Sequence, residues 1–562
     1  MPSNIGRPYA YQSVAGDDPY LTVEISDLSY GVNSRSDGAQ LLPGGMGPGP
    51  NQAAVLINAD LSTPGQTKKR PAMLKVGDTL TATGGIVGLA SYAPSRSSAS
   101  AGLLHAAEST LRYLQDQGSA GFVSSWTAVS AGFTNKSTYD IVPGSLTGRG
   151  DVMIVQNGSD NAYVFEADGT LRDTGNANDS PPKSLINVSH VNRLWCFGDE
   201  ATIDKADWLF WGNALPTAYS GAFDRTTQAF KINSGEGGSA AAMVPYRIAQ
   251  VDYLALFKTR SIWALPLANT DISANMLQPI DRSKGCVAKR CAAQVGDDIW
   301  YLAPDGVRSL QRTSEDRIKG FSFPLSYWLK EDYDLIDWRY IDQAKCVWWD
   351  SKFFITLPVK RNGASSQTTC NTVWVAWPGL QYAIGTEVFP AWSIFQGWAV
   401  SSWAKRIYKG KEQLFAGDAA TGKVYQVFGI TGADDGTAYT YQEESRTLDF
   451  GLPYQKKVGG ELVIRALISG NYNITAYIAT DDTDYQKLGT FNMAGSGPAL
   501  PVSLPFTLAN SAVVTAGFHL DSYGEWYRAK IKLAQSENNQ GDDVTILSRA
   551  ITAYPVQYGG GE

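Results

Sequence analysis

Short apolar and aromatic runs, each closed by a turn signal, recur through the middle of this chain and constrain its fold more than any other feature. Between about residues 75 and 440 they often come in pairs, such as 298–302 with 306–310 and 413–417 with 423–427. An Asp-Gly or a Thr-Gly step lies between the two members of each pair, which is typical of a β-hairpin. The pattern therefore predicts a succession of antiparallel hairpins.

One segment fits two descriptions. Residues 106–116 have a composition compatible with a short helix, whereas 104–114 also fits a hairpin that turns at Glu108-Ser109. Helical signal is scarce elsewhere in the chain, so we predict strands here as well.

The composition agrees with a chain built from strands. Charged residues make up 18% of the 562 positions, aromatic residues make up 11%, and there are 56 glycines. A typical globular chain is about 25% charged. Aromatic side chains favour strands and glycine favours tight turns, so we predict an all-β fold.

Hairpins arranged around an axis form a β-propeller, and an irregular β-propeller is the architecture that we predict for residues 75–440. About 365 residues at some 40–50 per blade give roughly seven or eight blades. A pair of β-sandwiches or a β-helix is the competing architecture. The aromatic density favours the propeller, because large side chains fill the space between blades that pack face to face.

The two ends of the chain differ from this middle part. Residues 1–74 contain a run dense in proline and glycine at 42–50, which predicts an extended N-terminal arm: either a disordered tail or an ordered arm on a neighbouring subunit. Within it, 53–57 is predicted to be a short strand. In residues 441–562, apolar and polar side chains alternate, most clearly at 526–533. This alternation predicts a C-terminal β-sandwich, jelly-roll-like in character.

Charge and cysteine content exclude several classes of protein. A net charge of −7 argues against a free-standing electrostatic nucleic-acid binder. The sequence shows neither an apolar stretch long enough for a transmembrane helix nor a signal peptide at its start. The five cysteines lack CxxC spacing, which argues against a disulfide framework or a zinc cluster and favours synthesis in a reducing cytoplasm.

The sequence contains few candidates for catalysis. The three histidines, His105, His190 and His519, lie far apart and are interpreted as structural. Residues 417–423 match the first part of a phosphate-binding GxxxxGK loop, but Val424 stands where Ser or Thr would hold magnesium. We therefore interpret this segment as a hairpin turn.

Carboxylates and glycines in loops provide weaker candidates. A propeller glycan hydrolase would need paired carboxylates, for which Asp298, Asp305, Glu315 and Asp316 are candidates, but the Ser-x-Asp-x-Gly-x-x-Trp box of sialidase-type propellers is absent. The acidic loop 481–484 is either a calcium site or, as we favour, a solvated turn. The glycine-rich segment 233–239 is interpreted as a loop and not as a dinucleotide-binding fingerprint. We expect no catalytic site, no cofactor and no bound metal.

The basic cluster Lys68, Lys69 and Arg70 is the interaction site that the sequence singles out. Three interpretations stay open: a solvated surface, a contact that docks the arm on an acidic neighbour, or a contact with phosphate.

The order of short motifs near the N-terminus resembles that of a known family. The segments are 27–33 (DLSYGVN), 58–60 (NAD) and 68–71 (KKRP). They resemble the Asp-Leu-Ser-Gly-Gly-Leu-Asn-like start, the Asn-containing strand and the Arg-(Lys)-Arg-Pro-Gly element of tail proteins from tailed bacteriophages. The chain differs at Tyr30 and Ala72, where that family often has glycine. Residues 285–307 resemble a blade element of the same propellers.

The resemblance implies a β-propeller tail protein of a short-tailed phage, either a tail nozzle or the plug that stabilises packaged DNA. It implies a hexameric ring below the adaptor and portal proteins, contact with tail fibres, genomic DNA along the axis, and a place in the virion after assembly in the bacterial cytoplasm. Six copies of a chain with net charge −7 carry −42, and an acidic lumen lets DNA slide. The alternatives are a tail-tip binding module for fibres or the host surface and a propeller glycan hydrolase.

Overall fold

We analysed a computed structural model of the whole chain. The structure describes residues 20–25, 28–35, 51–79, 84–95, 101–117, 121–232, 238–248, 250–268, 272, 276–311, 323–384, 387–408, 410–430, 432–467, 472–493, 513–535 and 544–556.

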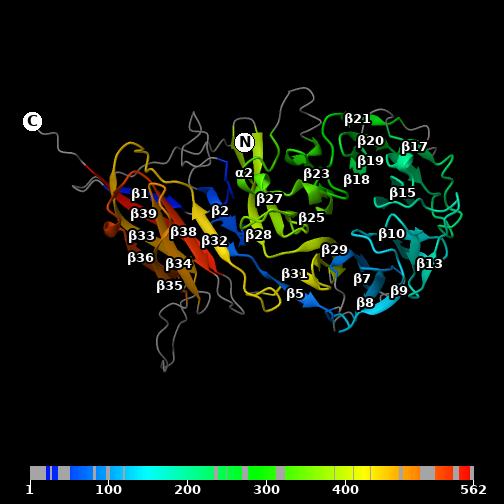
Figure 1. Cartoon of the computed structure of the whole chain (residues 1–562), viewed down its shortest axis with the longest axis horizontal. Coiled ribbons are helices and arrows are strands. Elements are labelled where there is room, and N and C mark those ends of the chain that lie inside the picture. Colours follow the sequence, from blue (N-terminus) through cyan, green and yellow to red (C-terminus); the bar gives the residue numbers. More distant parts are fainter. Residues whose placement is uncertain are drawn as a thin grey trace, which may run out of the picture.

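The chain is all-β, and six small sheets are arranged as blades of a β-propeller (Figure 1). The first contains β6 (Ile86–Tyr92), β7 (Gly102–Ala107), β8 (Thr110–Gln115) and β9 (Thr127–Ala131). The second contains β10 (Asp140–Leu146), β11 (Gly150–Gln156), β12 (Tyr163–Phe165) and β13 (Leu171–Asp173). The third contains β14 (Asn187–His190), β15 (Arg193–Phe197), β16 (Trp208–Trp211) and β17 (Ala229–Lys231). The fourth contains β18 (Ala240–Ile248), β19 (Val251–Lys258), β20 (Ile262–Pro266) and β21 (Gln278–Asp281).

The last two small sheets differ from this pattern. The fifth has three described strands, β22 (Ala292–Val295), β23 (Asp298–Ala303) and β24 (Gly306–Ser309). The sixth takes its outer strand from the N-terminal part of the chain: β29 (Val400–Tyr408), β30 (Lys411–Asp418) and β31 (Val424–Ile430) are joined by β5 (Ala72–Val76). In this last pair, Val424 lies opposite Val76. The propeller is thus closed by two segments that lie far apart in the sequence.

A nine-stranded sheet completes the ring. Its first four strands are β25 (Cys346–Trp349), β26 (Lys352–Leu357), β27 (Thr372–Ile384) and β28 (Glu387–Gln396). β25 contacts β22 on one side and β29 on the other, so these strands stand between the fifth and sixth small sheets. The sequence predicts seven or eight blades. Six small sheets are separate blades, and β25–β28 occupy one further position in the ring. These four strands belong to the nine-stranded sheet, which continues outside the propeller.

Aromatic side chains pack between neighbouring blades, as the composition suggested. Tyr92 from β6 meets Phe165 from β12 with 5.5 Å between ring centroids. Phe257 from β19 meets Tyr301 from β23 at 5.1 Å. Such contacts bury large apolar areas where two sheets face each other, and they explain why a chain with little charge forms this fold.

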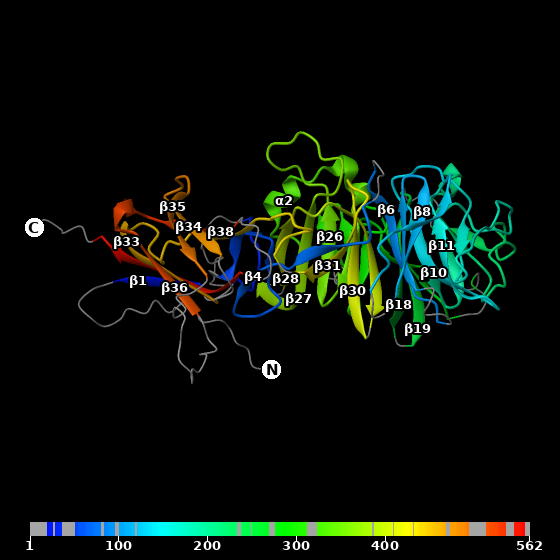
Figure 2. The ribbon, with the colours of Figure 1, turned by 90° about the horizontal axis from the view of Figure 1, so that it is seen from below.

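The C-terminal part forms a β-sandwich beside the propeller (Figures 1 and 2). One layer is the outer part of the nine-stranded sheet: β2 (Ala53–Ile57), β32 (Tyr441–Ser445), β38 (Ala529–Gln535), β34 (Asn473–Thr480) and β35 (Gln486–Asn492). The other layer is a seven-stranded sheet of β1 (Leu21–Ile25), β3 (Ala59–Asp60), β4 (Thr67–Lys69), β39 (Thr545–Pro555), β33 (Lys457–Leu467), β36 (Val513–His519) and β37 (Glu525–Trp526). Buried side chains of both layers, including Leu462, Ile478 and Ile531, belong to one hydrophobic core.

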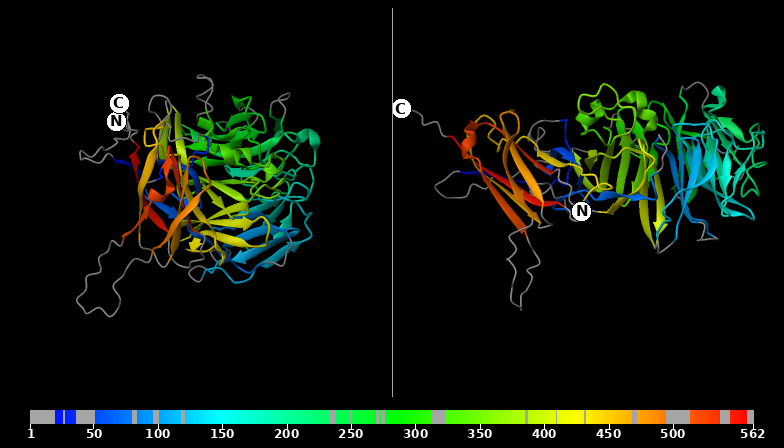
Figure 3. Two further views of the ribbon diagram at one scale, coloured as in Figure 1. Left: turned by 60° about the vertical axis from the view of Figure 1, so that its left-hand side comes forward. Right: turned by 60° about the horizontal axis from the view of Figure 1, so that its bottom comes forward.

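The described part of the expected N-terminal arm forms strands with its own chain. β1 pairs with β39, and β2 lies between β28 of the propeller and β32 of the sandwich. β4 pairs with β39 and β5 with β31, so the segment runs from the sandwich into the propeller (Figure 3). Residues 1–19 and 36–50, which include the proline- and glycine-rich run, lie outside the described residues.

The ambiguous segment at 104–114 is a hairpin. β7 and β8 pair in register from Gly102 with Gln115 to Ala107 with Thr110, and Glu108 has a φ of 53° in the turn. The prediction of strands is confirmed. The helices of the described residues are short: α2 (Lys330–Asp334) and the 3₁₀ turns η4 (Ile203–Lys205), η6 (Trp338–Gln343) and η7 (Asp521–Tyr523).

Candidate functional site

Two residues of the basic cluster lie inside the molecule. Lys69 and Arg70 are buried, at 4% and 0% exposure, between the sandwich and the propeller, whereas Lys68 is half-buried at the end of a strand pair. The position follows from the local sequence, because β4 ends at Lys69 and β5 begins at Ala72. Arg70 therefore stands in the connection between the two parts of the fold.

Arg70 is held by a carboxylate and by aromatic rings. Its guanidinium donates to both carboxylate oxygens of Asp434, at 3.0 and 2.6 Å, and its Nε donates to Oδ1 of Asn58 at 2.9 Å. The guanidinium carbon also lies 3.8 Å from the ring centre of Tyr439 and 4.4 Å from that of Trp398. A planar, permanently charged guanidinium suits this bidentate and stacked arrangement. The acidic neighbour of Arg70 thus belongs to the same chain.

Lys69 has partners of its own. Its Nζ donates to Oε1 of Gln535 at 2.9 Å and lies 4.3 Å from the ring centre of Tyr439. Lys69 therefore joins β4 to β38 within the sandwich, whereas Arg70 joins the segment that leads into the propeller to the connection between β31 and β32.

The GxxxxGK segment is a hairpin turn between β30 and β31. Oδ1 of Asp418 accepts the backbone N–H groups of Ala420 and Thr421, and the backbone N–H of Asp418 bonds to the carbonyl of Lys423. Nζ of Lys423 lies 2.9 Å from Asp435. A strand follows the lysine, so the helix N-terminus that binds phosphate in such loops is not formed here.

Two of the four candidate carboxylates are placed by the structure, and both bond to neighbouring groups. Asp298 accepts the N–H groups of Ile299 and Gln311 and the indole N–H of Trp300. Asp305 accepts two bonds from Arg308 and pairs with Lys284, which hold the pKa of its carboxyl below the usual value despite burial. Glu315 and Asp316 lie outside the described residues.

The histidines lie in separate places. His105 is fully buried against Trp126, and this burial lowers its pKa from 6.5 to about 3. His190 lies 3.8 Å from Asp252; burial nevertheless lowers the pKa of its imidazole. His519 ends β36 opposite Glu461. The structure does not bring these three histidines together.

All five cysteines are described and none forms a disulfide. Cys196, Cys286, Cys291 and Cys370 are buried, and Cys346 is partly exposed. Burial raises the pKa of the Cys370 thiol to about 12. Within the ranges that the structure describes, no group of three or more His, Cys, Asp or Glu side chains is placed to hold a metal ion.

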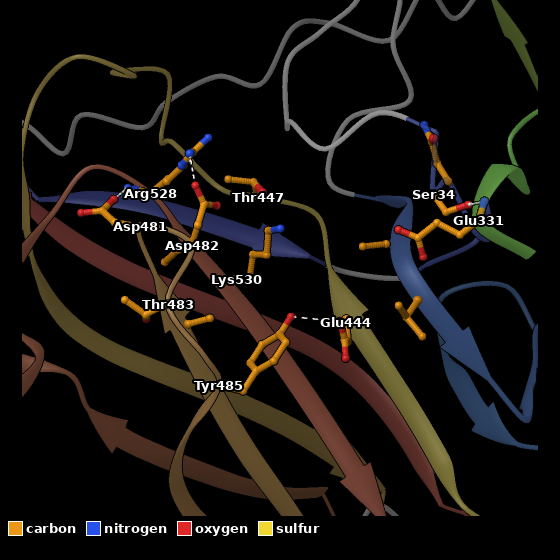
Figure 4. A pocket seen from close by; sticks show the side chains of 15 residues that line it. Ser34, Glu331, Glu444, Thr447, Asp481, Asp482, Thr483, Tyr485, Arg528 and Lys530 are labelled. Carbon is orange, nitrogen blue, oxygen red and sulfur yellow. Dashed lines mark hydrogen bonds and ion pairs between the residues drawn. The ribbon is translucent and has the colours of Figure 1, made fainter. Parts of the chain in front are cut away.

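A pocket of about 350 Å³ opens where the sandwich meets the propeller, and sequence reasoning did not find it (Figure 4). One wall comes from the sandwich, with the turn at 481–485, the connection between β37 and β38, and the start of β38. The other wall comes from the segment at 33–34, from β2 and from the start of α2. The residues that line the pocket are Asn33, Ser34, Ala54, Val55, Glu331, Glu444, Thr447, Ala479, Asp481, Asp482, Thr483, Tyr485, Arg528, Ala529 and Lys530.

The acidic turn that we considered for calcium forms the rim of this pocket. Asp481 and Asp482 have φ angles of 47° and 64°, which aspartate tolerates in turns. Oδ1 of Asp481 accepts the backbone N–H groups of Tyr527 and Arg528, at 2.8 and 3.0 Å. Asp482 forms an ion pair with the side chain of Arg528. Both carboxylates thus bond to the neighbouring strand connection.

A second set of side chains that bond to one another lies in the sandwich wall. Glu444 accepts the hydroxyl of Tyr485 at 3.1 Å and lies 3.2 Å from Nζ of Lys532. Lys532 also lies 5.2 Å from the ring centre of Tyr485. On the opposite wall, the hydroxyl of Ser34 accepts the backbone N–H of Glu331 at 3.0 Å and donates to the carbonyl of Trp328. These residues come from distant parts of the sequence, and no short motif could have identified them.

No protein-family model matches the chain, and a comparison with curated proteins finds no match. Among solved structures, the exo-β-1,3-galactanase of Phanerochaete chrysosporium with galactose aligns with 73% of this chain and 95% of its own, at 9% identity and a TM-score of 0.24. Saccharomyces cerevisiae Sqt1 aligns with 63% of this chain and 99% of its own, at 7% identity and a TM-score of 0.33. BBS1N in complex with ARL6DN aligns with 64% and 97%, at 11% identity and a TM-score of 0.33.

These structural neighbours differ in function and include a glycoside hydrolase. In the part of the chain that the structure covers, no helix is both long and apolar enough to cross a membrane.

Proposed function

We propose that this chain is a structural protein of a short-tailed phage virion, forming a hexameric tail nozzle ring below the adaptor. There it closes or conducts the DNA channel during genome retention and ejection. The N-terminal segment supports this proposal most strongly, because the residues that resemble phage tail proteins are also those that join the two parts of the fold. Asn33, Asn58 and Arg70 all lie in this segment, and β2 pairs with strands of both parts. We expect this pairing to hold the two parts of the fold together, which suits a tail component.

The contacts of the candidate catalytic groups also favour a structural role. Asp298 and Asp305 are bonded to neighbouring groups, and His105, His190 and His519 are dispersed. General acid–base chemistry needs a pair of groups that converge on a substrate. We therefore propose that the chain is not an enzyme. We expect that incubation of the chain with cell-wall or capsule polysaccharide releases no reducing ends. If reducing ends are released, and substitution of a single carboxylate abolishes their release, the proposal is wrong.

The decisive experiment is to measure the mass of the purified chain and to image it by negative stain, alone and mixed with a portal–adaptor complex. Rings or tubes of about six copies, or assembly only on the adaptor, are the expected result. A stable monomer that does not bind the adaptor would overturn the proposal.

A second candidate is a tail-tip module that contacts fibres or the host surface through the sandwich. The pocket beside β38 favours it, because concave sites with a few convergent polar groups are where ligands bind. This candidate predicts that the full chain binds a tail fibre or isolated cell envelope, and that substitutions in the pocket weaken the binding.

A further inference from the structure

We infer that the pocket between the sandwich and α2 is a binding site for a neutral saccharide unit. The inference concerns a ligand and goes beyond the proposed place in the virion, on which it does not depend.

The size of the pocket fits a small polar ligand. Its volume of about 350 Å³ lies near the lower end of the range of about 300–1,000 Å³ that is usual for ligand sites. The pocket is formed by distant segments that are themselves strands or fixed turns, so its walls exist before a ligand arrives.

Four of the six charged side chains that line the pocket, Glu444, Asp481, Asp482 and Arg528, bond to neighbouring groups, which favours a neutral ligand. Asp482 pairs with Arg528, and Glu444 pairs with Lys532. Asp481 is satisfied by two backbone N–H groups. A cationic or an anionic ligand would have to compete with these partners, whereas a hydroxyl group can add a hydrogen bond to the remaining lone pairs and N–H groups.

The mixture of donors and acceptors is suited to hydroxyl groups. Carboxylates accept, Arg528 and Lys530 donate, and the hydroxyl of Thr483 does both. Sugar hydroxyls also donate and accept, so a ring with several hydroxyls can bond to several of these groups at once. Hydrogen bonds to charged groups are stronger than those between neutral groups. The ion pairs hold these charged groups in fixed directions.

Tyr485 supplies the apolar surface that a sugar ring requires. Its hydroxyl is bonded to Glu444 (Figure 4). Lys532 lies 5.2 Å from the centre of its ring, so the orientation of the ring is fixed. The C–H groups of a pyranose pack on such a ring while its hydroxyls point to the polar walls. Ala54, Val55 and Ala479 add apolar surface to the lining.

The test is to titrate the full-length chain with glucose, galactose and N-acetylglucosamine at millimolar concentrations, by calorimetry or by ligand-observed NMR. The charged controls are N-acetylneuraminic acid and lysine amide. We expect at least one neutral sugar to bind, and we expect Tyr485→Ala to weaken its binding by about tenfold or more.

Three further variants separate stacking from loss of fold. Tyr485→Phe keeps the ring and should retain most of the binding. Asp482→Asn keeps the left-handed turn but removes the ion pair with Arg528, and should weaken the binding. Tyr454→Ala removes a tyrosine of the sandwich that is 95% exposed and lies outside the pocket, and should have no effect.

Three results would overturn the inference. The first is that none of the three neutral sugars binds to the folded wild-type chain. The second is that a folded Tyr485→Ala variant binds the sugar as well as the wild type does. The third is that lysine amide alone binds, which would assign the pocket to a cationic side chain. None of these results bears on ring formation, so the saccharide site and the structural role are tested separately.

Discussion

The burial of Arg70 is the feature of a single residue that the sequence predicts least well. From the sequence it belongs to a basic run, which is usually solvated, yet the structure buries it fully against Asp434, Tyr439 and Trp398. The free energy of a buried ion pair depends on both partners being present, because removal of one leaves the other charge without compensation. The charge of this side chain is thus used inside the molecule, in an ion pair with Asp434, and not at the surface.

Replacement of Arg70 by alanine is expected to destabilise the chain by about 3–5 kcal/mol, since Asp434 loses its bidentate partner in a site that is 13% exposed. Arg70→Lys should also destabilise the chain, because an ammonium group cannot reproduce the bidentate and stacked contacts. Denaturant unfolding provides the measurement. Lys68→Ala is the matched control, with an expected change within about 0.5 kcal/mol; equal effects at positions 68 and 70 would contradict the structural role.

His105 makes stability depend on pH. Burial lowers its pKa to about 3 in the folded chain, against 6.5 when it is unfolded. Only the unfolded chain binds the proton between these values, so the contribution of this residue to stability is present above about pH 6.5 and is lost as the pH falls towards 3. The melting temperature of the wild type should therefore fall over this range. His105→Phe should flatten that part of the profile; an unchanged slope would argue against the burial of a neutral imidazole.

At the scale of elements, the close approach of neighbouring blades requires small residues at particular points of the strands. Gly417 in β30 is such a point, because a Cβ built there would lie 2.6 Å from Cγ2 of Ile86 in β6 and 2.6 Å from the hydroxyl of Ser402. The glycine thus allows the sixth small sheet to pack against the first. By contrast, a Cβ built on Gly379 in β27 would have no neighbouring atom within 4 Å.

Gly417→Ala is expected to lower stability by about 1–3 kcal/mol, as overpacking of a core does. Gly379→Ala should be neutral or slightly stabilising, because the space is open and alanine reduces the freedom of the unfolded chain. Thermal unfolding of the two variants side by side measures the difference. A larger loss at position 379 than at 417 would contradict the packing of β30 on β6.

At the scale of the whole molecule, the thiols report how tightly the propeller is packed, because all five cysteines lie in it. Four of the five cysteines are buried, from Cys196 in the third small sheet to Cys370 beside β27. A buried thiol with a raised pKa reacts slowly with thiol reagents because little thiolate is present and access is blocked.

We therefore expect the native chain to react with a thiol reagent such as DTNB at one cysteine, Cys346, and the unfolded chain to react at all five. Cys346→Ser should abolish the fast reaction of the native chain and leave four thiols in denaturant. Rapid reaction of several thiols in the native state would indicate that the blades open readily.

The sequence by itself determined the class of fold, because hairpin signals, alternation and aromatic runs are local and need no information about distant contacts. The hairpins at 104–114 and 413–427 are predicted correctly for this reason. Only the tertiary structure decided which strands meet. β5 pairs with β31 across some 350 residues, β2 joins the propeller to the sandwich, and Lys69 and Arg70 are buried where these parts meet. The pocket depends on the same long-range pairing, since Ser34, Glu331, Tyr485 and Arg528 lie in four segments that share no local pattern. Local propensity specifies strands and turns, whereas the burial of apolar faces between distant strands fixes the partners and therefore the site.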